Sequence, residues 1–174
     1  MSKRFEFLCV TVLAILLVGT ACRPKEIELP FDSIEQIPQM QTDKQWRERE
    51  PGLMVMAGPE DLAQTDDLFS DDAQAQLQSL GFDQYFAVAV FEGLQGYLFP
   101  PPFGIEVQRV TKKGSVVTIH SATHRPTGEV ERYPVEVSPY HLVKIQREKV
   151  KRGEIEFALI VDGKRVAQQT HRLP

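Results

Sequence analysis

The chain has 174 residues, of which 42% are hydrophobic and 25% charged, and its formal net charge is −4. This length suffices for one domain with a packed core, and the apolar fraction excludes a fully disordered chain. The acidic net charge gives no support for nucleic-acid binding. With 2 cysteines, the chain cannot be a disulfide scaffold.

The first segment, residues 1–21, is predicted to be a secretory signal peptide. Lys3 and Arg4 precede an unbroken run of apolar and small residues from Phe7 to Ala21. A positive start, a short apolar region and small residues before a cleavage site are the parts of such a signal. The run is shorter than the roughly 20 residues of a membrane-spanning helix, so a permanent anchor helix is the less favoured alternative.

The end of this segment, Val18–Cys22, reads VGTAC and resembles the lipobox of bacterial lipoproteins. The resemblance implies that Cys22 becomes the first mature residue and carries a diacyl lipid. Cys9 leaves with the signal, so lipidation also accounts for a lone thiol in an exported protein. Two or more acyl chains hold a protein stably on a membrane. The sequence therefore predicts a lipoprotein on the extracytoplasmic side of the bacterial cell membrane; an ordinary signal peptide is the alternative.

The next segment, residues 22–52, is predicted to be an acidic, proline-containing tether. It contains four prolines from Pro24 to Pro51 and shows little hydrophobic periodicity. A flexible chain of this length spans roughly 30 Å, which would hold the folded part away from the membrane. Residues 53–174 are then expected to form a single β-rich domain.

This domain is expected to begin with a short strand, Leu53–Ala57, and a turn at Gly58–Leu62 that opens a first short helix. A second helix should begin at Ser70 or Asp71 and end at Gly81. Three apolar residues at helical spacing mark its buried face: Ala73, Leu77 and Leu80.

From Phe86 onward the pattern changes to the two-residue period of strands. The expected strands are Phe86–Phe91, Gly104–Val110, Ser115–Ile119, Glu129–Val137, Tyr140–Val150, Glu154–Val161 and Lys164–Thr170. Turns are predicted at Lys113–Gly114 and Pro126–Gly128, and hairpin turns of two residues at Arg152–Gly153 and Asp162–Gly163. The predicted fold is mainly β within the α+β class: an antiparallel β-sandwich or open barrel with two short N-terminal helices.

Three of these segments, together with a helix ending in Leu80–Gly81, resemble the PrcB C-terminal domain family. They are YFAVAVFEG (Tyr85–Gly93), GIEVQRVTKKGSVVTI (Gly104–Ile119) and SPYHLVKIQR (Ser138–Arg147). This family is named after an accessory lipoprotein subunit of a bacterial surface protease complex. The resemblance implies a protein that is not an enzyme, and it does not carry a role in a protease complex over to this chain. The chain departs from the family at Leu94–Gly104, where LQGYLFPPPFG replaces the family's glycine-rich turn.

No metal or other cofactor is expected. His120 and His124 have a spacing that suits zinc on a helix, but a strand separates them by about 13 Å. Four aspartates could suggest calcium, yet they lack the glycine and distal glutamate of an EF-hand loop, and capping explains acids beside a helix start. These aspartates are Asp66, Asp67, Asp71 and Asp72.

No catalytic residue is predicted, and the protein is not expected to be an enzyme. The chain lacks a Gly-x-Ser-x-Gly motif and a second mature cysteine, so no nucleophile stands out. His141 has the same strand parity as Val143 and Ile145 and is expected to be a hydrogen-bonded, partly buried residue.

Two surfaces are candidates for binding. The first is an aromatic loop beside Pro100–Pro102, which could bind a partner or fold back as a plug for the sandwich. Its residues are Tyr97, Leu98, Phe99 and Phe103. The second is a basic strand and turn, which could bind an acidic partner or anionic lipid, or protect a sheet edge. Its residues are Lys144, Arg147, Lys149, Lys151 and Arg152.

The predicted function is a membrane-anchored, non-catalytic interaction or assembly module with a protein partner in the cell envelope. A small-ligand or protease-inhibitory binding protein is the alternative.

Overall fold

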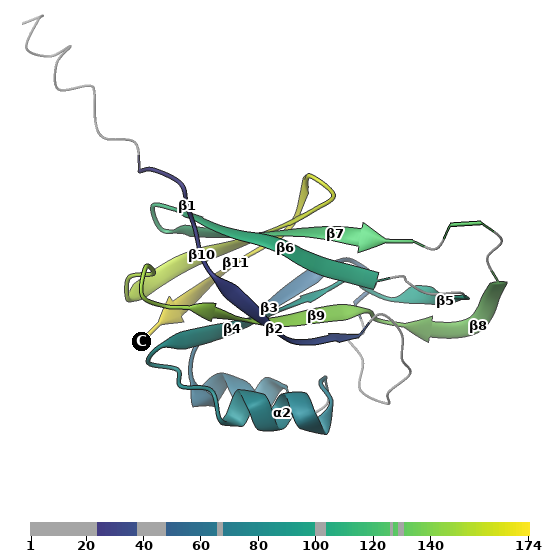
Figure 1. Ribbon diagram of the computed structural model, residues 1–174, viewed down its shortest axis with the longest axis horizontal. Coiled ribbons are helices and arrows are strands. Elements are labelled where there is room, and N and C mark those ends of the chain that lie inside the picture. The colour runs from purple at the N-terminus through teal and green to yellow at the C-terminus, as the bar shows by residue number, and fades with distance from the viewer. Residues whose placement is uncertain (1–23, 38–47, 66–67, 100–103, 126, 129–130) are drawn as a thin grey trace, which may run out of the picture.

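The computed structural model describes residues 24–37, 48–65, 68–99, 104–125, 127–128 and 131–174. Two β-sheets face each other, and a helix lies on the outer side of one of them (Figure 1). The predicted mainly β fold with few helices is confirmed.

The larger sheet has five strands in the order β1-β6-β7-β10-β11. Its strands are β1 (Ile27–Glu28), β6 (Gly104–Lys113), β7 (Val116–His124), β10 (Gly153–Val161) and β11 (Lys164–Leu173). The predicted hairpin turns at Lys113–Gly114 and Asp162–Gly163 join β6 to β7 and β10 to β11. Asp162 has φ 49° and Gly163 φ 79°, as a tight hairpin turn of two residues requires.

The second sheet has four antiparallel strands in the order β2-β9-β4-β3. They are β2 (Phe31–Ile37), β3 (Gly52–Met56), β4 (Tyr85–Phe91) and β9 (Tyr140–Gln146). The run from Phe86 to Phe91 is fully apolar because β4 is an inner strand covered on both faces.

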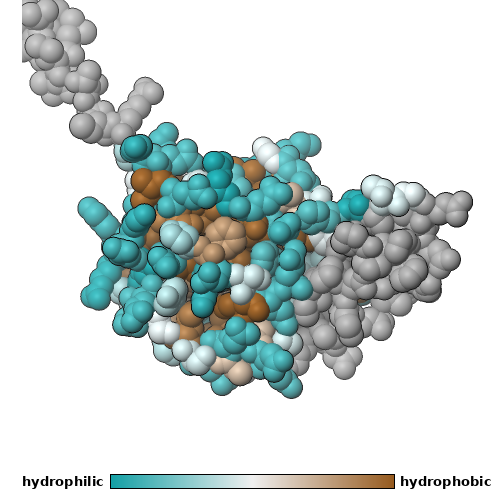
Figure 2. Space-filling model, in the orientation of Figure 1, coloured by the Kyte–Doolittle hydropathy of each residue, from teal (hydrophilic) through white to brown (hydrophobic). Residues whose placement is uncertain are grey.

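The main core fills the space between the two sheets. Alternate residues of β4, such as Phe86, Val88 and Val90, face this core and meet Phe157 and Leu159 of β10. The rings of Phe86 and Phe157 pack edge to face with their centroids 5.7 Å apart. On the face shown in Figure 2, hydrophobic residues gather between the two sheets and hydrophilic residues surround them.

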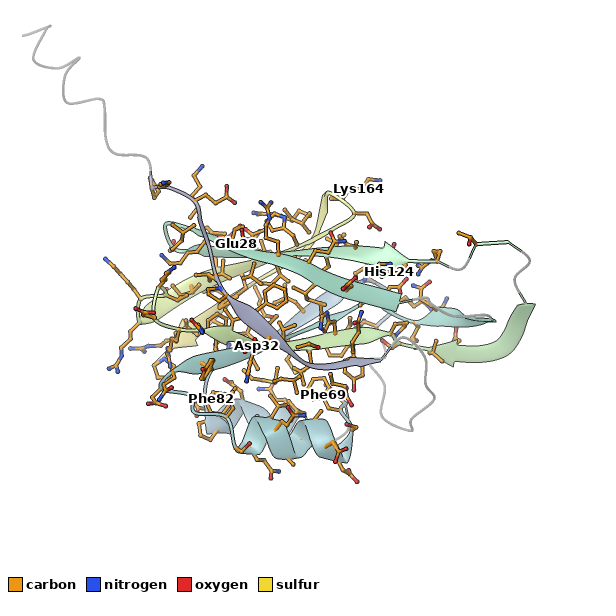
Figure 3. The ribbon with its side chains drawn as sticks, viewed as in Figure 1. Glu28, Asp32, Phe69, Phe82, His124 and Lys164 are labelled. Atoms are coloured by element: carbon orange, nitrogen blue, oxygen red, sulfur yellow. The ribbon has the colours of Figure 1, made fainter. Side chains whose placement is uncertain are left out.

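A second core lies on the outer face of the four-stranded sheet. The helix α2 (Asp71–Gln78) buries Ala73 and Leu77 there, as their spacing predicted. Ser70 caps this helix by accepting a hydrogen bond from the N–H of Ala73 at 3.2 Å. Phe69, labelled in Figure 3, packs between the helix and the sheet. A short 3₁₀ helix, η1 (Pro59–Gln64), precedes α2.

The predicted tether, residues 22–52, is partly wrong, because its described N-terminal part belongs to the fold. β1 pairs with β6, and β2 forms the edge of the four-stranded sheet beside β9. Leu29, between the two strands, is 1% exposed and belongs to the main core. Prolines and acids outnumber apolar residues here, but a few buried side chains suffice to dock the segment.

Two further expectations need correction. The Arg152–Gly153 turn joins different sheets, since β9 lies in one and β10 in the other. β10 pairs with β7 in parallel, so the larger sheet is mixed. A two-residue turn motif predicts only that the chain changes direction. Which sheet the next strand joins depends on which apolar faces of the other elements it can cover.

Candidate functional site

A two-stranded ribbon extends from one end of the sandwich (Figure 1). It consists of β5 (Gln95–Phe99) and β8 (Glu131–Val137), paired antiparallel. Among the described strands, these two pair with each other and join neither larger sheet. The ribbon continues the β4–β9 pair, because the N–H of Glu92 donates to the carbonyl of Pro139 at 2.9 Å between them.

Gly93 marks the point where the ribbon leaves the sheet. Its φ is +88°, a conformation that side-chain-bearing residues rarely adopt. A Cβ at this position would lie 2.3 Å from the carbonyl oxygen of Arg49. The close approach of residues 48–50 therefore requires glycine, and the N–H of Leu94 donates to the carbonyl of Glu48 at 3.0 Å.

The two ribbon strands are irregularly paired. Gly96 is opposite Glu136 and Leu98 is opposite Arg132, so three residues of β8 face one residue of β5. Pro134 lies within these three, and proline has no N–H to donate to the ladder. The bulge accommodates that missing donor and bends the ribbon.

An ion pair between a buried glutamate and a partly exposed arginine lies at the base of the ribbon. Glu92 is 2% exposed, and its Oε1 accepts a hydrogen bond from Nη2 of Arg125. Its other oxygen, Oε2, is buried without a hydrogen-bond partner. Arg125 also donates to the carbonyl of His124 at 3.1 Å. The pair fastens the end of β7 to the start of the ribbon.

Other polar contacts cluster at the same end of the larger sheet. His124, labelled in Figure 3, lies at the end of β7 with Nε2 2.7 Å from Oε2 of Glu106. Thr123 donates to Asp162 through its N–H at 3.0 Å and its hydroxyl at 2.6 Å. These hydrogen bonds lower the pKa of the Asp162 carboxyl. All of these contacts link strand ends to one another.

The predicted aromatic loop is partly a strand. Residues 95–99 form β5, whereas the prolines and Phe103 lie outside the described residues. The side chains of Tyr97, Leu98 and Phe99 are also outside the described part. The choice between a binding loop and a plug therefore stays a prediction.

The predicted basic strand does not form one surface. Lys144 lies on β9, an inner strand, 3.6 Å from Asp32 and over the ring of Tyr85. Arg147 is 8% exposed and donates to the carbonyls of Phe82 and Pro174, both at 2.6 Å. The three remaining bases are exposed on the turn between β9 and β10: Lys149, Lys151 and Arg152. Because β9 lies between β2 and β4, Lys144 does not protect a sheet edge, which was the alternative role predicted for the basic strand.

His141 is buried, as its strand parity predicted, and His120 lies on strand β7. His141 is 4% exposed and faces the main core together with Val143 and Ile145. His120, on the outer face of β7, lies 3.2 Å from the hydroxyl of Thr111. Burial and the charge of Arg109 lower the pKa of His120. Among the described residues, no group of three or more His, Cys, Asp or Glu side chains could hold a metal ion.

Sequence reasoning missed two partly buried hydrogen-bond networks. Glu35 of β2 accepts hydrogen bonds from the hydroxyls of Ser70 and Tyr140, which ties the edge strand to the helix. Burial and the Glu35 carboxylate raise the pKa of the Tyr140 phenol. Asp61 of η1 accepts from the N–H of Ala57 at 2.7 Å and lies 3.1 Å from Nε2 of His171. The partners are far apart in sequence, so no local pattern signals them.

An open depression of about 370 Å³ lies at the other end of the sandwich. It is lined by Asp83, Gln84, Tyr85, Gln146 and Glu148. Small-molecule sites are usually enclosed and lined mainly by apolar side chains. This depression is open and lined mainly by polar side chains, so it does not itself have the features of a small-molecule site.

Comparisons with known proteins do not add an identification. The chain matches no protein-family model, no curated protein and no solved structure. Within the described residues, no helix is long and apolar enough to cross a membrane.

Proposed function

We propose that this protein is a lipid-anchored, extracytoplasmic bacterial lipoprotein that binds a protein partner in the cell envelope through its ribbon and catalyses no reaction. The role of an accessory subunit, suggested by the resemblance to the PrcB C-terminal domain family, is part of this proposal.

The observation that carries the proposal is the protruding ribbon. β5 and β8 extend beyond both sheets, and the pair has outer backbone edges that no other described strand covers. Uncovered strand edges are places where a second chain can add a strand. The ribbon sequence also contains Tyr97 and Phe99, and aromatic residues contribute much of the binding energy at protein interfaces.

The base of the ribbon supports the same proposal. Gly93 and the Glu92–Arg125 pair fix the direction in which the ribbon leaves the sandwich. A fixed arm loses less conformational entropy on binding than a flexible one, so more of the contact energy appears as affinity.

A site-specific cross-linking experiment tests the partner proposal. A photo-activatable residue replaces Gly96, which is exposed on β5 and has open space where a side chain would begin. We expect one discrete cross-linked product in native membranes, and we expect its loss when Phe99→Ala is added. The matched control replaces Gln168, exposed on the outer face of β11, and should give no such product.

Two outcomes would contradict the proposal. The first is the absence of a discrete product from Gly96. The second is a fall in the free energy of unfolding of about 3–5 kcal/mol in both Phe99→Ala and Phe103→Ala, because buried phenylalanines behave that way and binding residues do not.

The lipid anchor is tested separately by mass spectrometry of the mature N-terminal peptide. We expect a peptide that begins at Cys22 and carries a diacylglyceryl group. An unmodified peptide with another first residue would contradict the anchor while leaving the ribbon proposal intact.

A further inference from the structure

The position of Pro24 determines how the anchored domain can sit on a membrane. Pro24 lies against the turn between β6 and β7, where a Cβ added to Gly114 would be 3.5 Å from its Cγ. Three residues later, Ile27 pairs with Lys112 of β6. The chain therefore already packs against the fold at Pro24, the first of the described residues.

The chain between Pro24 and Cys22 is too short to act as a spacer. Two Cα–Cα steps of 3.8 Å place the two Cα atoms at most about 8 Å apart. A diacylated cysteine lies at the level of the lipid headgroups, because its acyl chains are in the hydrocarbon region. Anchoring at Cys22 thus brings the β6–β7 turn to the membrane surface, in contrast to the predicted tether of roughly 30 Å.

The same end of the sandwich presents exposed or partly exposed bases on two neighbouring turns. Figure 1 shows the β6–β7 turn, the β9–β10 turn and the C-terminus at this end, opposite the ribbon. The N–H of Glu156 donates to the carbonyl of Ser115 at 3.0 Å, which joins the start of β10 to the β6–β7 turn. The bases of the two turns are Lys112, Lys113, Lys149, Lys151 and Arg152.

Few acids offset these bases within the two turns. Glu148 is the exposed acid of the β9–β10 turn, and the other base there, Arg147, is buried against Phe82 and Pro174. The charge of Glu26 acts on His120, which lies on the outer face of the larger sheet. With Glu148 included, the charged residues of the two turns therefore carry a net positive charge, although the whole chain is acidic.

We infer that these two turns form a membrane-facing surface that contacts anionic phospholipid headgroups and directs the ribbon away from the membrane. This inference rests on the proposed anchor at Cys22. Anionic headgroups attract each basic side chain near the membrane surface. For each such side chain, this attraction raises the ratio of membrane-facing to tilted orientations of the domain roughly five-fold. The attraction acts only within a Debye length of about 8 Å, so bases elsewhere on the domain contribute little.

The geometry also separates the membrane from the ribbon. β6 has 10 residues and leads from the ribbon end of the sandwich to the basic turn. At about 3.3 Å per residue, this strand alone separates the two ends by roughly 30 Å. A partner could thus reach the ribbon without displacing the domain from the lipid.

The test uses the full lipidated protein in vesicles and measures the distance of two positions from the membrane. A lipidated Cys22 has no free thiol, so a single introduced cysteine can carry a fluorophore. Ser115→Cys labels the exposed β6–β7 turn, and Gly96→Cys labels the ribbon. The vesicles contain phosphatidylcholine, with or without phosphatidylglycerol, and a lipid that carries a headgroup quencher.

We expect the Ser115→Cys label to be quenched in vesicles with phosphatidylglycerol and the Gly96→Cys label to keep its full emission. Replacing the five bases of the two turns by glutamine should abolish the dependence of this quenching on phosphatidylglycerol. Lys164→Gln with Arg165→Gln, on the β10–β11 turn seen in Figure 3, is the matched control and should not change it. Thermal unfolding of each variant verifies that it is folded.

Three results would overturn the inference. Equal quenching of the two labels on a lipidated protein would exclude the orientation and leave the proposed anchor intact. Quenching at Ser115→Cys that does not depend on phosphatidylglycerol would exclude the contact with anionic headgroups. A mature protein without lipid at Cys22 would overturn both the inference and the proposed anchor.

Discussion

The imidazole of His141 on β9 accepts, through Nδ1, a hydrogen bond from the N–H of Val107 on β6, with the two nitrogens 2.9 Å apart. Because an amide N–H can only donate, Nδ1 carries no proton, and Nε2–H donates to the hydroxyl of Ser33 at 2.9 Å. The β6 ladder is irregular between Val107 and Arg109, which directs the N–H of Val107 to the histidine. One neutral side chain thus connects the two sheets.

This contact predicts a loss of stability in mild acid. Burial lowers the pKa of His141 to about 4, while the unfolded chain has the ordinary value of about 6.5. The unfolded state therefore binds a proton first, and the free energy of unfolding should fall as the pH is lowered from 6.5 to 4. The difference in pKa corresponds to about 3 kcal/mol. Urea unfolding at several pH values measures this change.

His141→Gln provides the control for this prediction. Glutamine does not titrate, so the variant should be less stable than the wild type at pH 7 and show a smaller pH dependence between 4 and 6.5. A wild type and a variant with parallel pH profiles would contradict the role of His141.

A second prediction concerns the outer edge of β3. In the orientation that satisfies both of its polar groups, the side-chain amide of Gln169 donates to the carbonyl of Leu53 at 3.1 Å and accepts from the N–H of Val55 at 3.3 Å. The Gln169 amide thus forms hydrogen bonds that a neighbouring strand would otherwise form with β3. Gln169→Leu should therefore lower the free energy of unfolding by about 1–3 kcal/mol and promote aggregation through the exposed edge. Gln168→Leu, on the opposite face of β11, should leave both unchanged within error; chemical unfolding and light scattering measure them.

A third prediction tests the exit of the ribbon. Gly93→Ala places a Cβ against the carbonyl of Arg49 in a backbone conformation with positive φ, so it should cost about 2–3 kcal/mol of stability. Gly96→Ala, which has open space at the Cβ position, should change stability by less than about 0.5 kcal/mol. Thermal unfolding compares the two variants. Equal effects would show that Gly93 does not constrain the ribbon.

A fourth prediction concerns the buried carboxylate at the ribbon base. Arg125→Ala removes the partner of Glu92 and leaves its charge buried, so we expect a loss of about 2–4 kcal/mol. Because the arginine is itself 45% exposed, the pair is worth less than a fully buried one. Adding Glu92→Gln should recover part of the loss, since a neutral amide costs less to bury. A double variant less stable than Arg125→Ala would contradict this account.

The strands and the helix could be predicted from the sequence because their signals are local. Period-two patterns located β6, β7 and β10, and the Ser70 cap with Ala73 and Leu77 located α2. The parity of His141 with Val143 likewise predicted that the histidine is buried. Each of these depends on which side chains lie on one face of a single element, and that follows from the backbone repeat alone.

The pairing of strands depended on the tertiary structure. Nothing in the local sequence indicates that β7 and β10 pair in parallel or that β9 and β10 separate into two sheets, because both depend on which apolar faces remain to be covered. The same holds for β1 and β2, whose polar sequence conceals the buried Leu29. The positions of the basic residues also depended on the tertiary structure. Arg147 is buried, whereas Lys112 and Lys113 lie at the β6–β7 turn, next to Pro24. The sequence by itself shows which residues are apolar and on which face of an element they lie. Which other residues they pack against is determined only when the whole chain folds.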